Sequence, residues 1–469
     1  MTKQFRIEHD FLGEKEIPND VYYGVQTLRA LENFKITDIP ISIEPKMLQA
    51  LGYVKKAAAL ANVDLGVLSE DIGKAIVSAC NAVIAGELND QFVVDAIQGG
   101  AGTSTNMNAN EVIANKALEI LGHEKGQYDI VHPNNHVNCS QSTNDAYPTA
   151  FRVALLLIIP KLIDAMQSLS RAFGQKADEF KDVIKMGRTQ LQDAVPMNLG
   201  QEFGAFATTI REDVQRLEVV KELFYEVNLG ATAIGTGINA PPGYAPVAVD
   251  HLRKLTRLPL ASSADLIEAT WDTGAYVQLS GVLRRIAVKL SKICNDLRLL
   301  SSGPRAGFNE INLPRMQPGS SIMPGKVNPV IPEVVNQIAF QVIGMDVTVT
   351  LASEAGQLQL NVMEPVMAFD LFVMLEMLQR GCRVLEEKCV TGITVNHEHC
   401  RQMVMNSIGI VTALNPVIGY EASALIAKEA LTSGGSVYDI ALEKGLIEKD
   451  KLDEIFSIEN LMNPKFFRK

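Results

Sequence analysis

The strongest constraint on the fold of this chain is a regular spacing of apolar residues in its middle part. One segment has apolar side chains at alternating steps of four and three residues, at Leu279, Leu283, Ile286, Leu290, Ile293, Leu297 and Leu300. This spacing puts a narrow apolar stripe along a long helix. Residues 203–224 and 338–352 repeat the pattern, and residues 151–180 and 366–389 favour two more long helices. Five such helices predict a bundle, with part of their surface buried against other subunits.

Polar segments with many turn-forming residues separate the helical parts of the chain. They lie at residues 98–108, 132–148, 228–246 and 303–329. The signal for β-structure is thin, so the predicted fold class is mainly α. We expect a mostly helical N-terminal domain (1–141), a central domain with the five-helix bundle (142–398) and a small helical C-terminal domain (399–469).

The overall charge and the apolar runs narrow the classes of function. The chain has 469 residues and a formal net charge of −11, without a long basic run, which argues against nucleic acid as a partner. The longest fully apolar run, Val153–Ile159, is far shorter than the roughly 20 residues that span a membrane. The N-terminus lacks an apolar export signal, and the six cysteines show no CxxC spacing. We therefore expect a cytoplasmic protein with reduced thiols and no membrane partner.

Two polar loops each offer hydroxyl and amide groups just before an expected helix. The first, Gln98–Asn108, has small residues that let the backbone approach a ligand, followed by Thr103, Ser104, Thr105 and Asn106. The second, Asn138–Pro148, contains Ser142, Thr143 and Asn144. These groups suit an anion at a helix N-terminus, but Ser, Thr and Asn are also the usual N-cap residues. Asp145 fits the capping interpretation, because a helix N-terminus favours a negative charge.

A third polar loop, Met186–Asp193, adds further donors. It contains Thr189, Gln190 and a cation at Arg188. For Arg188 we favour an ion pair with Asp193 or with another acid over contact with a substrate. Each of these three loops has a structural explanation of its own, so none of them alone establishes a site.

The histidines and cysteines do not predict a metal site. The densest group is His397–Cys400, but adjacent residues on a helix or strand point in different directions. His132 and His136 are four residues apart, and Pro133 interrupts any helix between them. We therefore assign no metal ligand.

The segment Gly319–Pro329, with the sequence GSSIMPGKVNP, is the most specific motif in the chain. It places two hydroxyls, a cation and an amide on one loop, at Ser320, Ser321, Lys326 and Asn328. It is not a phosphate-binding loop, because five residues rather than four separate its two glycines and Val327 stands where Ser or Thr would bind magnesium. Such a loop can close over an anionic substrate, and a nearby cation is what a hydroxyl needs before it acts as a base.

Together, the loops resemble the three active-site segments of the aspartase/fumarase superfamily, whose signature is GSSIMPGKVNP. The similarity extends from Tyr22–Ala30 to Asn460–Pro464. Within the superfamily the chain resembles the aspartate ammonia-lyases rather than the class II fumarases, at Ala101, Thr143, Gln190, Asn309 and the segment Gly356–Pro365. Gln190 stands where fumarases and some aspartases carry a His, and an amide cannot titrate, so no acid–base role falls to this position.

This resemblance implies a mainly α, three-domain fold with a long central helical bundle. It implies the reversible anti elimination of ammonia from L-aspartate to fumarate, with Ser320 on a flexible loop as general base and an aci-carboxylate (enediolate) intermediate. The residues that hold the β-carboxylate would be Thr103, Ser142, Thr143 and Ser321. Those that hold the α-carboxylate would be Thr189, Lys326 and Asn328. The amino group would lie near Thr103, Asn144 and Gln190.

The resemblance also implies a homotetramer in which each active site takes loops from three subunits. No organic cofactor is required, because the reaction involves neither redox chemistry nor a Schiff base. In some relatives a divalent cation such as Mg²⁺ is an activator. Two alternatives stay open: a fumarase or another lyase of the superfamily, and a silent relative used for binding. The presence of Ser320, Lys326 and Asn328 argues against the silent relative.

Overall fold

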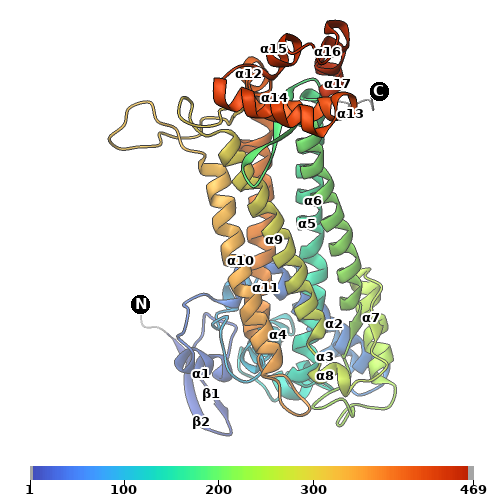
Figure 1. The fold of residues 1–469 in the computed structure, drawn as a ribbon. Coiled ribbons are helices and arrows are strands. Elements are labelled where there is room, and N and C mark those ends of the chain that lie inside the picture. The colour runs from blue at the N-terminus through green and yellow to red at the C-terminus, as the bar shows by residue number, and fades with distance from the viewer. Residues whose placement is uncertain (1–3, 463–469) are drawn as a thin grey trace. The chain divides into compact units, whose positions relative to one another are not determined.

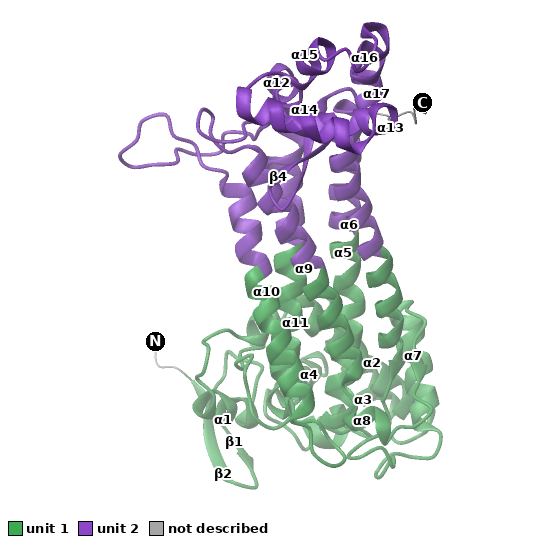
Figure 2. Cartoon of the chain, viewed as in Figure 1, with its two compact units in different colours: residues 1–163, 215–285, 340–378 green, residues 164–214, 286–339, 379–469 purple. Residues whose placement is uncertain are grey.

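The computed structural model describes residues 4–462 (Figure 1). The chain forms two compact units (Figure 2). Unit 1 comprises Met1–Ile163, Gln215–Arg285 and Phe340–Leu378, and unit 2 comprises Asp164–Val214, Ile286–Ala339 and Gln379–Lys469. The division into three domains at residues 141 and 398 stays a prediction.

The five long helices predicted from the apolar stripes are all present among residues 4–462. They are α5 (Thr143–Glu179), α6 (Leu199–Lys221), α9 (Gly274–Leu300), α10 (Val330–Glu354) and α11 (Glu364–Lys388). Each contributes one part to unit 1 and the other part to unit 2. Every residue of the α9 stripe is at most 5% exposed, which confirms the helical periodicity seen in the sequence.

Helix α5 begins at Thr143, whereas the sequence placed its start near Phe151. Pro148 has no N–H group and leaves the carbonyl of Asn144 without its helical donor. The side-chain amide of Asn228 donates to this carbonyl oxygen at 3.0 Å. A tertiary contact therefore replaces the hydrogen bond that Pro148 cannot donate. A local apolar periodicity in the sequence does not reveal such a contact.

Unit 1 combines parts of the five long helices with other helices and two strand pairs. Its other helices are α1 (Val25–Asn33), α2 (Pro45–Asp64), α3 (Glu70–Ala85), α4 (Thr103–Ile120), α7 (Tyr244–Thr256) and α8 (Glu268–Trp271). Its strands are the antiparallel pair β1 (Phe5–Asp10) and β2 (Gly13–Pro18) and the parallel pair β5 (Glu226–Val227) and β6 (Ala261–Ser262). The core contains the ring of Phe151, stacked on Tyr276 with centroids 4.4 Å apart and in edge contact with Phe372.

Unit 2 contains the C-terminal part of the chain. Its antiparallel strand pairs are β3 (Ile184–Thr189) with β4 (Gln192–Asn198) and β7 (Ile311–Asn312) with β8 (Thr394–Val395). Its short helices are α12 (His397–Met405), α13 (Asn415–Ile418), α14 (Tyr420–Ser433), α15 (Val437–Glu443), α16 (Lys449–Ile455) and α17 (Ile458–Met462). Buried residues of these helices form one cluster with Ile184 and Met186 of β3, so the C-terminal helices support this hairpin.

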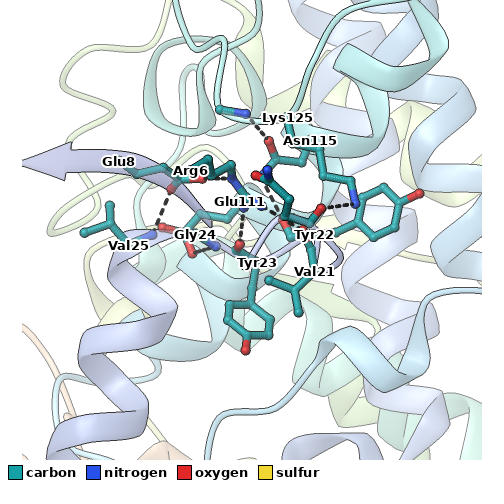
Figure 3. A network of polar contacts seen from close by, with 12 residues as sticks. Arg6, Glu8, Val21, Tyr22, Tyr23, Gly24, Val25, Glu111, Asn115 and Lys125 are labelled. Atoms are coloured by element: carbon teal, nitrogen blue, oxygen red, sulfur yellow. Dashed lines mark hydrogen bonds and ion pairs between the residues drawn. The ribbon is translucent and has the colours of Figure 1, made fainter. Parts of the chain in front are cut away.

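Two buried carboxylates fix the N-terminal segment of unit 1 (Figure 3). Glu8 accepts a hydrogen bond from the N–H of Val25 and pairs with Arg6 at 2.7 Å. Glu111 accepts from the backbone N–H groups of Gly24, Gln26 and Thr27. Gly24 is required here, because a Cβ atom would lie 2.4 Å from the carboxylate of Glu8. The network thereby fixes the first turn of α1.

One helix among the described residues, α10, is long and apolar enough to cross a membrane by length and composition. Its side chain at Asp346 accepts hydrogen bonds from Ser280 and Arg284 of α9 within unit 1. Helices of a bundle core have the same apolar composition, so this helix alone is weak support for a membrane span.

Candidate active site

Unit 1 contains a polar cavity where the first two predicted loops meet, with a volume of about 370 Å³. Thr103, the first residue of α4, lies in its wall together with Ser142 and Thr143 at the start of α5. The other lining residues are Gln26, Asn106, Met107, Asn134, Asn138, Gln141, Thr232, Ala233, Ile238 and Asn239. The structure thus brings together three of the residues predicted to bind a carboxylate.

The backbone before α4 forms a left-handed turn. Gly100, Ala101 and Gly102 have φ angles of 91°, 57° and 87°. Gly102 leaves no room for a side chain, because a Cβ atom would lie 2.5 Å from the ring of Tyr147. Gly102 is also the N-cap of α4, without a capping side chain, so the hydroxyls of this loop do not cap the helix as the alternative interpretation proposed. The hydroxyl of Thr103 donates to the carbonyl of Gly100 at 2.7 Å, and its lone pairs stay available to a donor.

Asp145 fixes the start of α5 and connects it to the loop at residues 228–246. Its carboxylate accepts from the N–H of Ser142 at 2.8 Å, as expected for an acid at a helix N-terminus. It also accepts from the N–H groups of Gly230 at 2.8 Å and Thr232 at 3.2 Å. Burial raises the pKa of Asp145 to about 6. This carboxylate therefore holds Ser142 and Thr232 in place beside the cavity.

Thr143 and Asn144 have different environments. The hydroxyl oxygen of Thr143 accepts a hydrogen bond from the side-chain amide of Asn106 at 3.1 Å. Asn144 donates its amide to the carbonyl of Ala233 at 2.7 Å and is not among the residues that line the cavity. Its side-chain oxygen has no donor among the described residues, so it can accept a hydrogen bond from a ligand.

The remaining predicted residues, Thr189, Gln190, Ser320, Ser321, Lys326 and Asn328, belong to unit 2. The signature loop is closed at its base by two contacts of Gly319. Its N–H donates to the carbonyl of Lys326 at 2.8 Å, and its own carbonyl accepts from the amide of Asn328 at 2.7 Å. A Cβ atom on residue 319 would lie 2.7 Å from the backbone nitrogen of Asn328, so this close approach requires glycine.

Ser320 lies within this closed loop and receives two backbone hydrogen bonds. Its hydroxyl oxygen accepts from the N–H of Ile322 at 3.2 Å and from the N–H of Met323 at 3.0 Å. Two N–H groups that converge on one oxygen stabilise negative charge there. The side chains of Ser321 and Lys326 are exposed. The loop is therefore arranged to favour an anionic oxygen at Ser320.

Thr189 and Gln190 lie at the tip of the β3–β4 hairpin. Thr189 ends β3, and the two turn residues, Gln190 and Leu191, have φ angles of 54° and 63°. Turns with positive φ at both central residues usually contain Asn and Gly. A side chain in the left-handed region costs roughly 1–2 kcal/mol. Backbone strain of this kind is common at functional sites, which favours a role for this tip.

Arg188 forms an ion pair and does not have a free guanidinium. It donates to the carboxylate of Glu310 at 2.5 Å. Lys185 lies 3.1 Å from the same carboxylate, and Glu310 is fully buried. Asp193 instead accepts from the hydroxyl of Ser407 at 2.7 Å. The predicted pairing of Arg188 with an acid is confirmed, and the acid is Glu310.

A second cavity, of about 700 Å³, lies in unit 2 beside the signature loop. Lys326 and Asn328 are in its wall, whereas Ser320 and Ser321 are not. Arg298 and Arg315 also line this cavity, although no sequence motif indicates them. They are single basic residues outside any motif, so no local pattern pointed to them.

Histidines from both groups considered as metal ligands are engaged in other contacts. His136 accepts a hydrogen bond from the backbone N–H of His132 at 2.8 Å, and His399 contacts the carbonyl of Phe308 at 2.8 Å. Among residues 4–462, no three side chains of His, Cys, Asp or Glu gather closely enough to hold a metal ion. An activating Mg²⁺ therefore stays a prediction without assigned ligands.

Comparison with known proteins places the chain in a family. A family described as "Lyase" matches residues 13–344, and one described as "Fumarase C C-terminus" matches residues 410–463. The aspartate ammonia-lyase of Helicobacter pylori is 60% identical over 99% of each chain.

Two solved structures are also similar. The fumarate lyase:delta crystallin from Brucella melitensis bound to cobalt is 56% identical, with a TM-score of 0.95, over 98% of this chain and 99% of that one. The class II fumarase from Schistosoma mansoni is 34% identical, with a TM-score of 0.94, over 98% of this chain and 100% of that one. The chain therefore belongs to the aspartase/fumarase superfamily of lyases and has its mainly α-helical fold.

Proposed function

We propose that the chain is an aspartate ammonia-lyase, a carbon–nitrogen lyase that converts L-aspartate to fumarate and ammonia in a reversible anti elimination. The observation that carries the proposal is the 60% identity, over nearly the full length, to an aspartate ammonia-lyase, against 34% to a class II fumarase. Gln190 supports the same assignment, because it replaces the His expected in fumarases.

The chemical difficulty is the removal of a proton from C3, next to a carboxylate that is already negative. The electron pair left on C3 spreads into the β-carboxylate and gives an aci-carboxylate dianion. It then forms the C2–C3 double bond while the C2–N bond breaks and its electrons leave with ammonia. Donors aimed at the β-carboxylate carry most of the catalysis, and one such donor contributes roughly 3–4 kcal/mol.

The cavity of unit 1 supports the assignment of the β-carboxylate and amino-group sites. Ser142 and Thr143 lie together in its wall and can donate to the carboxylate. Thr103 donates to Gly100 and is left with acceptor capacity, which suits the substrate ammonium. Asn144 also has a side-chain oxygen free to accept. We assign Ser321 to the β-carboxylate as well.

The signature loop of unit 2 supports Ser320 as the general base. The N–H groups of Ile322 and Met323 favour its alkoxide form, and Lys326 adds a positive charge on the same loop. The proton from C3 would transfer to Ser320 Oγ. We assign Thr189, Lys326 and Asn328 to the α-carboxylate and Gln190 to the surroundings of the amino group. The loop would close over the substrate and exclude water.

We also propose that the chain works as a cytoplasmic homotetramer whose active sites each take residues from three subunits. The predicted residues are divided between the two units, and several apolar side chains on α10 are exposed, at Val334, Phe340, Val347 and Leu351. Burial of these side chains against other subunits would form the interface. We expect no organic cofactor, because the elimination needs neither redox chemistry nor a Schiff base.

The direct test is the ultraviolet absorbance of fumarate after addition of L-aspartate to the purified protein, with L-malate in a parallel cuvette. We expect absorbance to rise with L-aspartate alone. A rise with L-malate alone would make the protein a fumarase. No rise with either substrate would favour a silent relative or a different amino or succinyl substrate.

A further inference from the structure

Lys55, on α2, has an ammonium group that is completely buried among side-chain amides of unit 1. It is 0% exposed. Its Nζ atom donates to Oδ1 of Asn106 at 2.6 Å, to Oδ1 of Asn138 at 3.1 Å and to Oε1 of Gln141 at 2.8 Å. These three amides all line the cavity that contains Ser142 and Thr143. Lys55 itself is not in the wall, so it lies behind the candidate site.

The contacts of Lys55 fix the direction in which these amides are turned. An ammonium group can only donate, so each of the three amides must present its oxygen to Nζ. The amide nitrogen of Asn106 then faces away from Lys55 and donates to Oγ1 of Thr143 at 3.1 Å. The hydroxyl of Thr143 donates to no acceptor among the described residues, so its O–H proton can point to a ligand. The chain of hydrogen bonds runs from Lys55 through Asn106 to Thr143.

The charge of Lys55 is not balanced by an ion pair among the described residues. The carboxylate whose charge acts on it is that of Asp145, which accepts from the backbone N–H groups of Ser142, Gly230 and Thr232. Burial lowers the pKa of Lys55 to about 7, and Asp145 acts in the opposite direction. The three oxygens around Nζ favour the charged form of Lys55, because only the ammonium group has three N–H donors. A buried cation without a partner destabilises a fold, and groups of this kind are concentrated at functional sites.

We propose that Lys55 is a positioning residue for the elimination: it holds Asn106 so that the hydroxyl of Thr143 donates to the β-carboxylate of the substrate. The proposal rests on the proposed function. The bonds from Lys55 and Asn106 polarise the hydroxyl of Thr143 and strengthen its own donation. The β-carboxylate gains a second negative charge on the way to the dianion, so this donation acts mainly on kcat.

A structural explanation competes with this proposal, because Lys55 also connects α2 to α4 and to the loop before α5. A double-mutant cycle between Lys55→Met and Thr143→Val separates the two explanations. If Lys55 acts through Thr143, Lys55→Met lowers kcat by about 10- to 100-fold in the native chain. In the Thr143→Val background it then lowers kcat by less than about twofold, the size of ordinary additivity error. An equal loss in both backgrounds would overturn the proposal.

The adjacent lysine provides a matched control. Lys56, on the same helix, donates to Oδ1 of Asn81 at 2.7 Å, and neither residue lines the cavity. We expect Lys56→Met to leave kcat unchanged while it removes a contact of the same kind. If Lys55→Met does not fold, a cycle between Asn106→Ala and Thr143→Val tests the second step of the same chain. Additive losses there would also overturn the proposal.

The experiments distinguish a wrong role for Lys55 from a wrong proposed function. If the native chain releases fumarate from L-aspartate and the cycle is additive, only the role of Lys55 is wrong. If the native chain releases no fumarate, the proposed function is wrong. The same cycle, measured by calorimetry as the Kd for succinate, then tests whether Lys55 prepares Thr143 for a carboxylate. Non-additive losses of succinate affinity would support that role, and additive losses would overturn it.

Discussion

Arg188 and Glu310 form a buried ion pair that anchors the hairpin ending in Thr189. The guanidinium nitrogen lies 2.5 Å from the carboxylate, and the guanidinium also lies 4.3 Å from the ring centre of Phe308. Lys185, earlier on the same strand, is 3.1 Å from the second carboxylate oxygen. One buried acid thus holds two basic residues of β3, and the strained tip at Gln190 is built on this support.

This arrangement predicts that Glu310→Gln is strongly destabilising. The substitution would leave the largely buried guanidinium of Arg188 without its counter-charge, whereas Lys185 keeps its pair with Glu202 at 2.6 Å. Breaking a buried pair in this way costs about 3–5 kcal/mol. Chemical denaturation would measure the lost free energy of unfolding. Glu70→Gln, which breaks the exposed pair of Glu70 with Lys74, is the control and should have no measurable effect. Equal denaturation midpoints for the native chain and Glu310→Gln would contradict the prediction.

Ser320→Ala should lower kcat for L-aspartate by about 100- to 10,000-fold, the contribution typical of a general base. The fold should persist, because Ile322 and Met323, which hydrogen-bond to the Ser320 hydroxyl, do so through backbone N–H groups of the same loop. Initial rates of fumarate formation and circular dichroism would measure both effects. Ser78→Ala is a suitable control, since Ser78 lies on α3 and its exposed hydroxyl donates to the backbone carbonyl of Lys74. Near-normal turnover in Ser320→Ala would refute the assignment.

The sequence predicted the long helices well, because their apolar stripes are a local and repeated signal. The buried seam of α9, from Leu279 to Leu300, follows directly from that spacing. The start of α5 was misplaced because Asn228, far away in sequence, compensates for Pro148. Local periodicity does not contain information on such a tertiary contact.

The candidate site was predictable where polar residues cluster in loops and not where single residues act. Thr103, Ser142 and Thr143 do meet in one cavity, as their loops indicated. Lys55 lies within an ordinary helical stretch, so nothing in its neighbourhood marks it as part of the site. The sequence around Leu191 does not indicate its positive φ either, because the hairpin rather than the residue type imposes this angle.

Lys326→Ala should mainly raise the KM for L-aspartate, by about 10- to 100-fold, because it removes a charged hydrogen bond to the α-carboxylate. The α-carboxylate keeps its charge throughout the reaction, so kcat should change much less. Steady-state kinetics over a wide range of aspartate concentration would separate the two constants. Lys74→Ala, at an exposed position on α3, should leave KM unchanged. An unchanged KM in Lys326→Ala would count against its role.

The stability of the protein should fall with rising pH through the ionisation of Glu364. Burial raises the pKa of Glu364 to about 8 in the folded chain, from an ordinary value near 4.5. Between these values the unfolded chain has lost the proton and the folded chain keeps it. This favours unfolding by up to about 1.4 kcal/mol per pH unit. Glu364→Gln removes the effect, so its stability relative to the native chain should increase from pH 5 to pH 8. Denaturation midpoints at both pH values measure this, and a constant difference would contradict it.

Active sites built from several subunits predict complementation between inactive chains. Ser320→Ala and Thr143→Ala chains should each be strongly impaired alone, but some sites of a mixed tetramer would receive an intact Ser320 from one chain and an intact Thr143 from another. Random mixing of equal amounts in a symmetric tetramer restores about a quarter of the sites. Mixing should follow denaturation and joint refolding, with fumarate formation as the measurement. A mixture of Ser142→Ala and Thr143→Ala chains is the matched control. Both substitutions lie in the same loop, so every site contains one of them. Activity in the first mixture no higher than that of the separate chains would contradict shared sites.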